Sequence, residues 1–328
     1  MERTIAGLLV DPVAGAFPGA VTIAGHRIAA VEAKPDADPS VLVLPGFVDL
    51  HVYEPAGLRE HGVTGYLLTR RDVVDARDEL CLGLHLEGPF LNSDMAGAIP
   101  PDEIRPVDLA ALGEWLAGGT VRLVTISPEI PKGLDAIRLV AAAGVVASVG
   151  HTKANAATTR ASIDAGARFA THVWNAMGPI RSRATGPVPE LLLDRRVTLG
   201  LIGDSRHLHP RIEELTIRTA GADRIALTSD QVRPPAELPD GRLLGGDRCG
   251  SQLVSRMARR FGYREAALMS SLVPARVLGL ADRGRLAPGF RADLALLDER
   301  FAPLETIAAG TTIWSPGHRP SAEVGRET

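Results

Sequence analysis

Five side chains that can bind a metal or carry a proton stand at the ends of short apolar segments. They are His51 in LPGFVDLH, Glu87 in GLHLEGPF, His151 in SVGHT, His172 in FATHVWNAM and Asp230 in ALTSD. Short apolar runs bounded by Gly, Pro or polar residues are typical of buried strands. In a barrel of parallel strands, the carboxyl ends and the loops after them form the active site, so we expect these five groups to meet.

The residue types favour a metal centre. One carboxylate and two neutral imidazoles suit Zn²⁺, with a fourth position left for water, and Fe²⁺, Co²⁺ or Mn²⁺ can occupy similar ligands. A bound divalent ion lowers the pKa of water to about 7 and polarises a carbonyl group. We predict Glu87, His151 and His172 as the ligands of one divalent ion, most simply Zn²⁺.

Asp230 and His51 complete the candidate chemistry. An aspartate beside the activated water can take its proton and later give it to a leaving amine, so we predict Asp230 as general base and acid. The alternative role of Asp230 is a helix N-cap, against which the following Pro234-Pro235 argues. His51 is an additional candidate ligand, with a structural role as the alternative.

Strand–helix alternation over the middle of the chain predicts an α/β fold, a (β/α)₈ TIM-type barrel. We predict strands at 46–51, 64–68, 82–86, 122–126, 145–149, 169–171, 198–202 and 225–228. We predict helices at 108–117, 133–143, 154–165, 210–220, 249–261 and 263–273. Segments 54–63 and 70–80 are too short for ordinary barrel helices, so we expect a partly reduced barrel.

The two chain ends have a different sequence pattern, which predicts short strands and turns. A chain of 328 residues has room for one barrel, of roughly 250 residues, and a small accessory unit. We expect residues 1–46 and 288–328 to form one small β-sandwich domain. Residues 47–287 are then the barrel.

Composition excludes some functions. The net charge is −3 and the pI is near 6.3, so no basic field predicts binding to nucleic acid or to a membrane surface. No apolar stretch reaches the ~18 residues of a membrane span, and the N-terminus lacks a signal-peptide pattern. Two cysteines are too few for a disulfide framework. We expect a cytoplasmic enzyme that acts on a small molecule.

Several motifs together resemble one family. LPGFVDLH, GLHLEGPFLN, SVGHT, ATHVWNAM, LTSD and GRLAPGFRADLALLD are similar to the N-acetylglucosamine-6-phosphate deacetylases of the amidohydrolase superfamily, from about residue 42 to about residue 300. The resemblance implies a barrel with a flanking β-sandwich, a divalent metal, usually a homodimer, and deacetylation of a phosphorylated N-acetyl sugar. It also implies ligands at Glu87, His151 and His172 and the proton shuttle at Asp230.

The resemblance further implies residues that contact the substrate. These are Ala98, Asn175, Ala176, Arg183, His207 and Gly250. Arg183 matches a phosphate-contacting arginine that can come from the neighbouring subunit, although its basic loop is also compatible with a solvated face. His207 precedes a helix start, which favours anions in any case, and Gly250 is alternatively a turn before a helix. Arg206 is an additional candidate for binding an anion.

Three departures from the family pattern concern the pocket. Metal-rich relatives carry H-x-H after the first strand, whereas this chain has Tyr53 in the third position. Tyrosine has a pKa of about 10 and is a poor ligand at neutral pH, so we expect one metal. Ile99 replaces a histidine and removes one polar contact to the substrate. Glu87 follows His51 after only 36 positions (87 − 51), because a glycine-rich loop is missing.

These departures leave rival functions open. The nearest rival is an amidohydrolase for a different N-acyl amine, an N-acylamino acid or a cyclic amide. A rival of another class is a catalytically silent relative that binds or assembles, against which the intact set of metal and proton-carrying residues argues. Only scattered arginines favour nucleic-acid binding.

Overall fold

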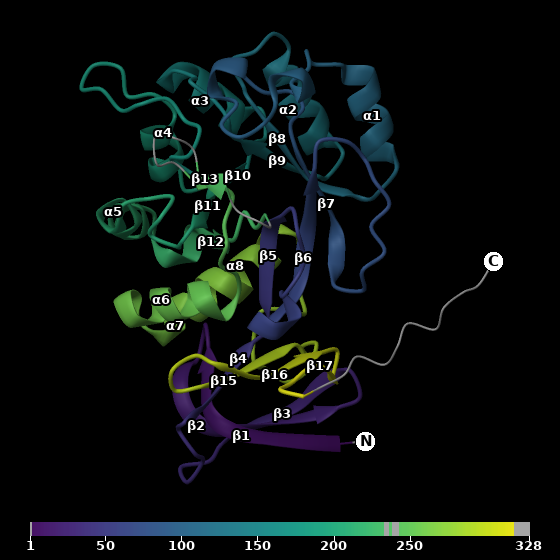
Figure 1. The fold of residues 1–328 in the computed structure, drawn as a ribbon, viewed down its shortest axis with the longest axis vertical. Helices are drawn as coiled ribbons and strands as arrows, with labels where there is room; N and C mark the ends of the chain where they lie inside the picture. Colours follow the sequence, from purple (N-terminus) through teal and green to yellow (C-terminus); the bar gives the residue numbers. More distant parts are fainter. Residues whose placement is uncertain (1, 233–235, 238–242, 318–328) are drawn as a thin grey trace, which may run out of the picture.

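The chain folds into two β units, and most of the helices pack around one of them (Figure 1). The computed structural model describes residues 2–232, 236–237 and 243–317. One unit is an eight-stranded parallel sheet that curls into a barrel, and the other is a seven-stranded sheet built from both chain ends. The predicted fold class, a TIM-type barrel with a small β domain, is confirmed.

The barrel strands follow one another in chain order around the sheet. They are β5 (Phe47–Val52), β6 (Val63–Arg70), β7 (Cys81–Glu87), β8 (Val121–Ile126), β9 (Val146–Val149), β10 (Phe169–Ala170), β11 (Thr198–Ile202) and β12 (Ile225–Thr228). Each overlaps one predicted strand, so all of those predictions are confirmed. Strands covered on both faces are nearly continuous in apolar residues, and all six residues of β5 are buried.

The barrel closes between β5 and β12 through a short seam. The backbone N–H of Asp230 donates to the carbonyl of His51 at 3.0 Å, and Val52 forms an isolated bridge with Gln231. The buried carboxylate of Asp49 accepts from the backbone N–H groups of His51 at 3.1 Å and Ser229 at 3.2 Å. The seam therefore sets His51 and Asp230 at the same end of the barrel.

Helices cover most of the barrel. They are α1 (Leu109–Ala117), α2 (Gly133–Ala142), α3 (Ala156–Asp164), α4 (Val188–Leu193), α5 (Pro210–Ala220), α6 (Ser251–Phe261), α7 (Tyr263–Ala267) and α8 (Val273–Val277). The predicted helices are confirmed, except that the last one is longer and contains a π-helical turn, Leu268–Leu272. The short α4, which follows Pro187, was not predicted.

One flank of the barrel is reduced, as expected. A 3-10 turn, η1 (Arg59–His61), connects β5 to β6, and residues 71–80 connect β6 to β7. Both connections lie wholly within residues 2–232 and contain no α-helix. Two further 3-10 turns, η2 (Ser93–Met95) and η3 (Pro101–Glu103), lie in the connection after β7, and η4 (Ala222–Arg224) precedes β12.

The small sheet joins the two ends of the chain. Its order is β17 (Thr311–Trp314), β16 (Pro303–Ala308), β15 (Leu294–Asp298), β4 (Val41–Pro45), β1 (Glu2–Asp11), β2 (Gly15–Ala24) and β3 (Arg27–Ala33). Gly46 alone separates β4 from β5, and a Cβ there would lie 2.3 Å from Thr64 Oγ1, so only glycine fits. The domain bounds 1–46 plus 288–328 and 47–287 stay a proposal, and residues 1 and 318–328 lie outside the described part.

Two smaller observations complete the fold. Residues beyond β12 form a two-stranded ribbon of β13 (Ala236–Glu237) and β14 (Leu243–Leu244). Among the residues that the structure describes, no helix combines the length and the apolar character that a membrane crossing needs.

The seam generates a stability prediction. Asp49→Ala leaves the buried N–H groups of His51 and Ser229 without an acceptor, so we expect the free energy of unfolding to fall by about 1–3 kcal/mol. Asp49→Asn keeps a side-chain oxygen and is expected to lose less. The midpoints of urea unfolding compare the stabilities of the variants, provided that their m-values are equal. An Asp49→Ala protein as stable as its parent would contradict this role.

Candidate metal centre and active site

The five residues singled out in the sequence meet at one end of the barrel. His51 lies in β5, Glu87 ends β7, His151 and His172 follow β9 and β10, and Asp230 follows β12. His151, His172 and Asp230 have left-handed φ values of 48°, 28° and 51°. Such backbone costs a non-glycine residue about 1–3 kcal/mol and persists where the surroundings require it, often at functional sites.

Glu87 is the hub of the cluster. Its Oε1 lies 3.0 Å from His151 Nε2 and 2.9 Å from His172 Nε2, and its Oε2 lies 3.4 Å from His51 Nε2. The ligand atoms of His51, Glu87 and His172 lie within 4.8 Å of one another. Burial opposes ionisation of Glu87, but the charge of His51 and hydrogen bonds from the imidazoles outweigh it and hold the pKa of Glu87 well below its usual range.

The tautomer of His151 tests whether a cation fits. His151 Nδ1 lies 2.8 Å from the carbonyl oxygen of Met95, which can only accept, so Nδ1 carries the hydrogen. With the hydrogen on Nδ1, Nε2 donates to Glu87 only when the ring is protonated; in the neutral ring, Nε2 points a lone pair at the carboxylate. Two lone pairs face each other stably only with a positive charge between them. The donor set therefore fits a metal, and the Met95 carbonyl is the usual kind of partner that orients a ligating imidazole.

His85 provides the contrast. Its Nδ1 lies 3.0 Å from the Leu50 carbonyl and its Nε2 lies 2.7 Å from Thr125 Oγ1, so protein groups satisfy both nitrogens. Burial holds the pKa of His85 well below its usual value. By contrast, the buried Nε2 of His51 and Nδ1 of His172 have no hydrogen-bond partner among the described residues. His85 is a neutral core histidine, whereas His51 and His172 each keep one nitrogen without a hydrogen-bond partner among the described residues.

Two carboxylates share His51. Its Nε2 lies 3.3 Å from Asp230 Oδ1, beside the contact with Glu87. Burial disfavours the imidazolium, but the charges of Glu87 and Asp230 outweigh it and raise the pKa of His51 to about 9. Burial also raises the pKa of Asp230, and the charge of Glu87 adds to this while His51 opposes it. The site favours positive charge, and the raised pKa makes Asp230 a stronger proton acceptor than an ordinary aspartate.

Two of the predicted substrate residues keep buried polar atoms unused. Asn175 Nδ2 and His207 Nε2 have no hydrogen-bond partner in the described part of the chain. His207 Nδ1 lies 2.8 Å from Asp204 Oδ2, which orients the ring. Buried polar groups are rarely left unpaired, so these two atoms are available to a ligand. Ala176 lies beside Asn175, and its carbonyl accepts from the backbone of Thr152 at 3.0 Å.

The turn that contains Ala98 lies over the site. A Cβ on Gly97 would lie 3.5 Å from His151 Cε1 and 3.7 Å from the Ala176 Cβ. Ala98 is exposed, whereas Ile99 is buried and does not offer a polar group. The polar contact that the resemblance implies at this position is therefore not available from Ile99, which packs instead.

The remaining predicted substrate residues lie farther out. Arg183 is exposed on the connection between β10 and α4, and its side chain makes no ion pair with a described residue. Arg206 Nη1 pairs with Asp247 Oδ2 at 2.5 Å. Residues Pro234 and Pro235, which argue against a helix cap at Asp230, lie outside the described residues. The substrate roles of Arg183 and Arg206 stay predictions.

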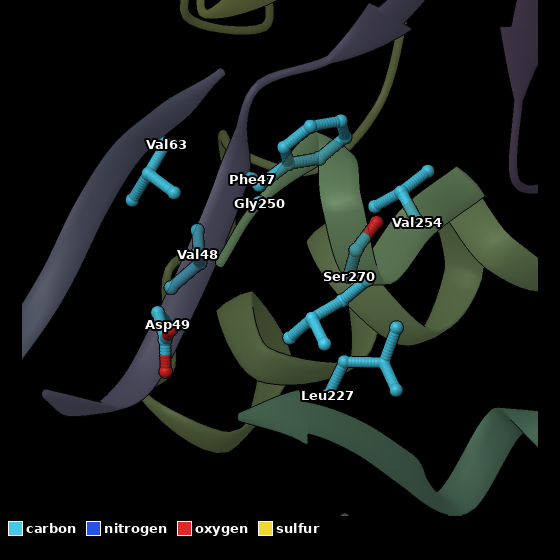
Figure 2. Close-up of a pocket in the computed structure, with 9 residues that line it drawn as sticks. Phe47, Val48, Asp49, Val63, Leu227, Gly250, Val254 and Ser270 are labelled. Atoms are coloured by element: carbon cyan, nitrogen blue, oxygen red, sulfur yellow. The ribbon is translucent and has the colours of Figure 1, made fainter. Parts of the chain in front are cut away.

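Gly250 lies at the start of α6, against the outer wall of the barrel (Figure 2). A Cβ there would lie 2.0 Å from the His61 carbonyl oxygen, so the position requires glycine. The adjacent cavity holds about 10 Å³, and its lining includes Phe47, Val63 and Leu227. This small apolar space is no substrate pocket, and a contact of Gly250 with the substrate stays a prediction.

Two contacts near the cluster, the hydrogen bond of Tyr53 to Glu87 and the role of Glu129, were not predicted from the sequence. The hydroxyl of Tyr53 donates to Glu87 Oε2; burial and then the charges of Glu87 and Asp230 raise the pKa of Tyr53 well above its usual value, so it stays protonated. Glu129 accepts from Thr152 Oγ1 at 2.5 Å and Lys153 N at 2.8 Å, and so holds the segment after His151. A carboxylate three residues after the 122–126 strand was the available signal for Glu129.

Comparison with known proteins agrees with this geometry. A sequence profile described as the amidohydrolase family matches residues 56–314. The chain therefore belongs to the amidohydrolase family. The expected enzyme class, a hydrolase that acts on an amide C–N bond, is confirmed by this membership and by the relatives.

Within that family the chain is similar to N-acetylglucosamine-6-phosphate deacetylases, as its motifs indicate. The protein of that name from Lysinibacillus sphaericus is 30% identical over 326 residues, which span 82% of this chain and 84% of the relative. The N-acetylgalactosamine-6-phosphate deacetylase of Escherichia coli O157:H7 is 36% identical over 243 residues, which span 66% of this chain and 64% of that protein.

Solved structures show the same likeness. The N-acetyl-D-glucosamine-6-phosphate deacetylase of Mycobacterium smegmatis superposes with a TM-score of 0.85 at 32% identity, covering 95% of this chain and 100% of that one. The Thermotoga maritima enzyme gives a TM-score of 0.87 at 30% identity, with coverage of 95% and 100%. An aspartate-to-alanine mutant of the Mycobacterium smegmatis enzyme was solved in complex with N-acetyl-D-glucosamine-6-phosphate.

The ligand set generates a metal-binding prediction. We expect Glu87→Ala, His151→Ala and His172→Ala each to lose most of the zinc that the parent retains after dialysis, because each removes one of three protein ligands. His209→Ala, which changes an exposed histidine of the same end of the barrel, is the matched control. Elemental analysis gives zinc per chain, and an unchanged ratio in a ligand variant would remove that residue from the set.

Proposed function

We propose that the chain hydrolyses the acetamide bond of N-acetylglucosamine 6-phosphate, releasing acetate and the free amine, with one divalent ion that is most simply Zn²⁺. The observation that carries this proposal is the 3.0 Å contact of His151 Nε2 with Glu87 Oε1, two atoms that both present lone pairs when the ring is neutral and then call for a cation. Asp230 beside the same cluster supplies the proton carrier. The named deacetylases among the relatives supply the substrate.

The metal and the protein divide the work. Held by Glu87, His151 and His172, a divalent ion would lower the pKa of water and polarise the acetyl carbonyl. Asp230 Oδ1 accepts a proton from the attacking water as the water oxygen bonds to the carbonyl carbon. When the C–N bond breaks, Asp230 gives that proton to the departing nitrogen. The raised pKa of Asp230 suits both transfers.

Groups around the cluster would hold the sugar phosphate. His207, oriented by Asp204, and Asn175 offer unused polar atoms on one side of the metal residues. Arg183 would hold the phosphate, because a guanidinium donates a fork of hydrogen bonds to such oxygens. The connection between β10 and α4 extends away from its own barrel (Figure 1), so we propose a homodimer in which Arg183 serves the partner's site.

A second candidate is N-acetylgalactosamine 6-phosphate. It is favoured by the relative of 36% identity that bears this activity in its name. The two sugars differ in the configuration of one hydroxyl, and the buried Ile99 offers no polar group that could distinguish them. A panel of both sugar phosphates, their unphosphorylated forms and an N-acetylamino acid separates these candidates. The predicted cytoplasmic location stays a prediction.

The proton carrier generates a kinetic prediction. We expect Asp230→Asn to lower acetate release from N-acetylglucosamine 6-phosphate by about 10²–10⁴-fold, because general acid–base catalysis contributes that much. The variant should keep its zinc, since Asp230 is not among the predicted ligands. Turnover and metal content are measured on one preparation. Near-normal turnover in the variant would contradict the assignment of the shuttle.

The phosphate contact generates a second kinetic prediction. We expect Arg183→Ala to raise KM for the phosphorylated sugar by about 10- to 100-fold with a smaller effect on kcat, because a hydrogen bond to a charged group contributes about 1.5–3 kcal/mol. Arg181→Ala, another exposed arginine of the same connection, is the control. Equal KM values for Arg183→Ala and the control would show that Arg183 does not bind the phosphate.

A further inference from the structure

Glu87 contacts three imidazoles and one phenol, that of Tyr53. Its hydroxyl donates to Glu87 Oε2, and its ring centroid lies 5.7 Å from that of His51. Glu87 Oε1, in contrast, faces His151 and His172. Oε1 thus contacts two imidazoles, whereas Oε2 accepts from the phenol and lies 3.4 Å from His51 Nε2.

Arg71, directly after β6, fixes the direction of this hydrogen bond. Its Nη1 lies 3.1 Å from the Tyr53 hydroxyl oxygen, and its guanidinium carbon lies 5.6 Å from the ring centroid. Because a guanidinium only donates, the Tyr53 oxygen accepts there, and its single hydrogen is left for Glu87. Arg71 is itself paired with Glu103 in η3.

The backbone of Tyr53 is held from the same side. Arg70 Nη1 donates to the Tyr53 carbonyl at 2.9 Å, and the Tyr53 N–H donates to the Gln231 carbonyl at 3.0 Å across the seam. Side chain and main chain are therefore both anchored, so the phenol cannot swing away from Glu87 without breaking several contacts.

We propose that Tyr53 is a positioning residue that makes Glu87 a one-oxygen ligand and thereby limits the centre to a single cation. A second cation between Glu87, His51 and Asp230 would need Oε2, which the phenol occupies. It would also approach the positive charge of Arg71, which lies 3.1 Å beyond the phenol oxygen. This inference rests on the proposed metal-dependent function and adds a reason for its stoichiometry.

Two substitutions test the two halves of the proposal. Tyr53→Phe removes only the hydroxyl, so Glu87 loses its anchor, and we expect zinc affinity to fall by about 10- to 100-fold, as is typical when a group that orients a ligand is lost. Tyr53→His replaces the phenol with a ligand and is expected to raise bound zinc from about one to about two equivalents per chain. Tyr66→Phe, which changes the tyrosine of β6, is the control.

Zinc titration of the full-length chain, read by elemental analysis and by competition with a chelator, gives affinity and stoichiometry together. Circular dichroism confirms that each variant is folded. If Tyr53→Phe binds one zinc with the parent's affinity, the hydroxyl does not position Glu87 and the proposal is overturned. It is equally overturned if a folded Tyr53→His stays at one equivalent. A parent chain that binds no zinc would instead contradict the proposed function itself.

Discussion

The carboxylate of Glu87 is buried among three imidazole rings and a phenol, and the arrangement is stable only with positive charge beside it. His151 donates from Nδ1 to the Met95 carbonyl, so in the neutral ring its other nitrogen turns a lone pair toward Glu87 Oε1. His51 also lies beside the carboxylates of Glu87 and Asp230, which favour positive charge at the same place. A divalent cation supplies this charge, and the chemistry of water activation follows from the same ion.

The rest of the barrel serves to bring these groups to one place. Parallel strands deliver their carboxyl ends to a common edge, and the seam between β5 and β12 closes the circle through Asp49 and Ser229. The flank with β6 and β7 has lost its helices, yet the residues that it contributes, Arg70 and Arg71, hold Tyr53 against the metal ligand. The shortened side of the fold thus acts on the centre directly.

Much of this could be predicted from residue order. Apolar runs bounded by turn residues identified every barrel strand, and the rule that active sites lie at strand ends selected the cluster. The sequence could not reveal that the backbone carbonyl of Met95 orients His151, because a carbonyl is present at every residue. That Tyr53 is not a ligand, argued from the pKa of tyrosine, stays a prediction. Its hydrogen bond to Glu87 depends on where Arg71 places the phenol, which the sequence does not show. The short α4 was missed because Pro187 and Pro189 stand at its start, where proline is easily taken as a sign of a loop.

Anomalous diffraction at the zinc edge from crystals of the zinc-loaded chain tests the central claim most directly. The account predicts one strong peak about 2.0–2.2 Å from Glu87 Oε1, His151 Nε2 and His172 Nε2, as expected for zinc bonded to these atoms. A peak elsewhere in the barrel, or no peak with the three side chains still in contact, would contradict the assignment of Glu87 as the hub of a metal centre.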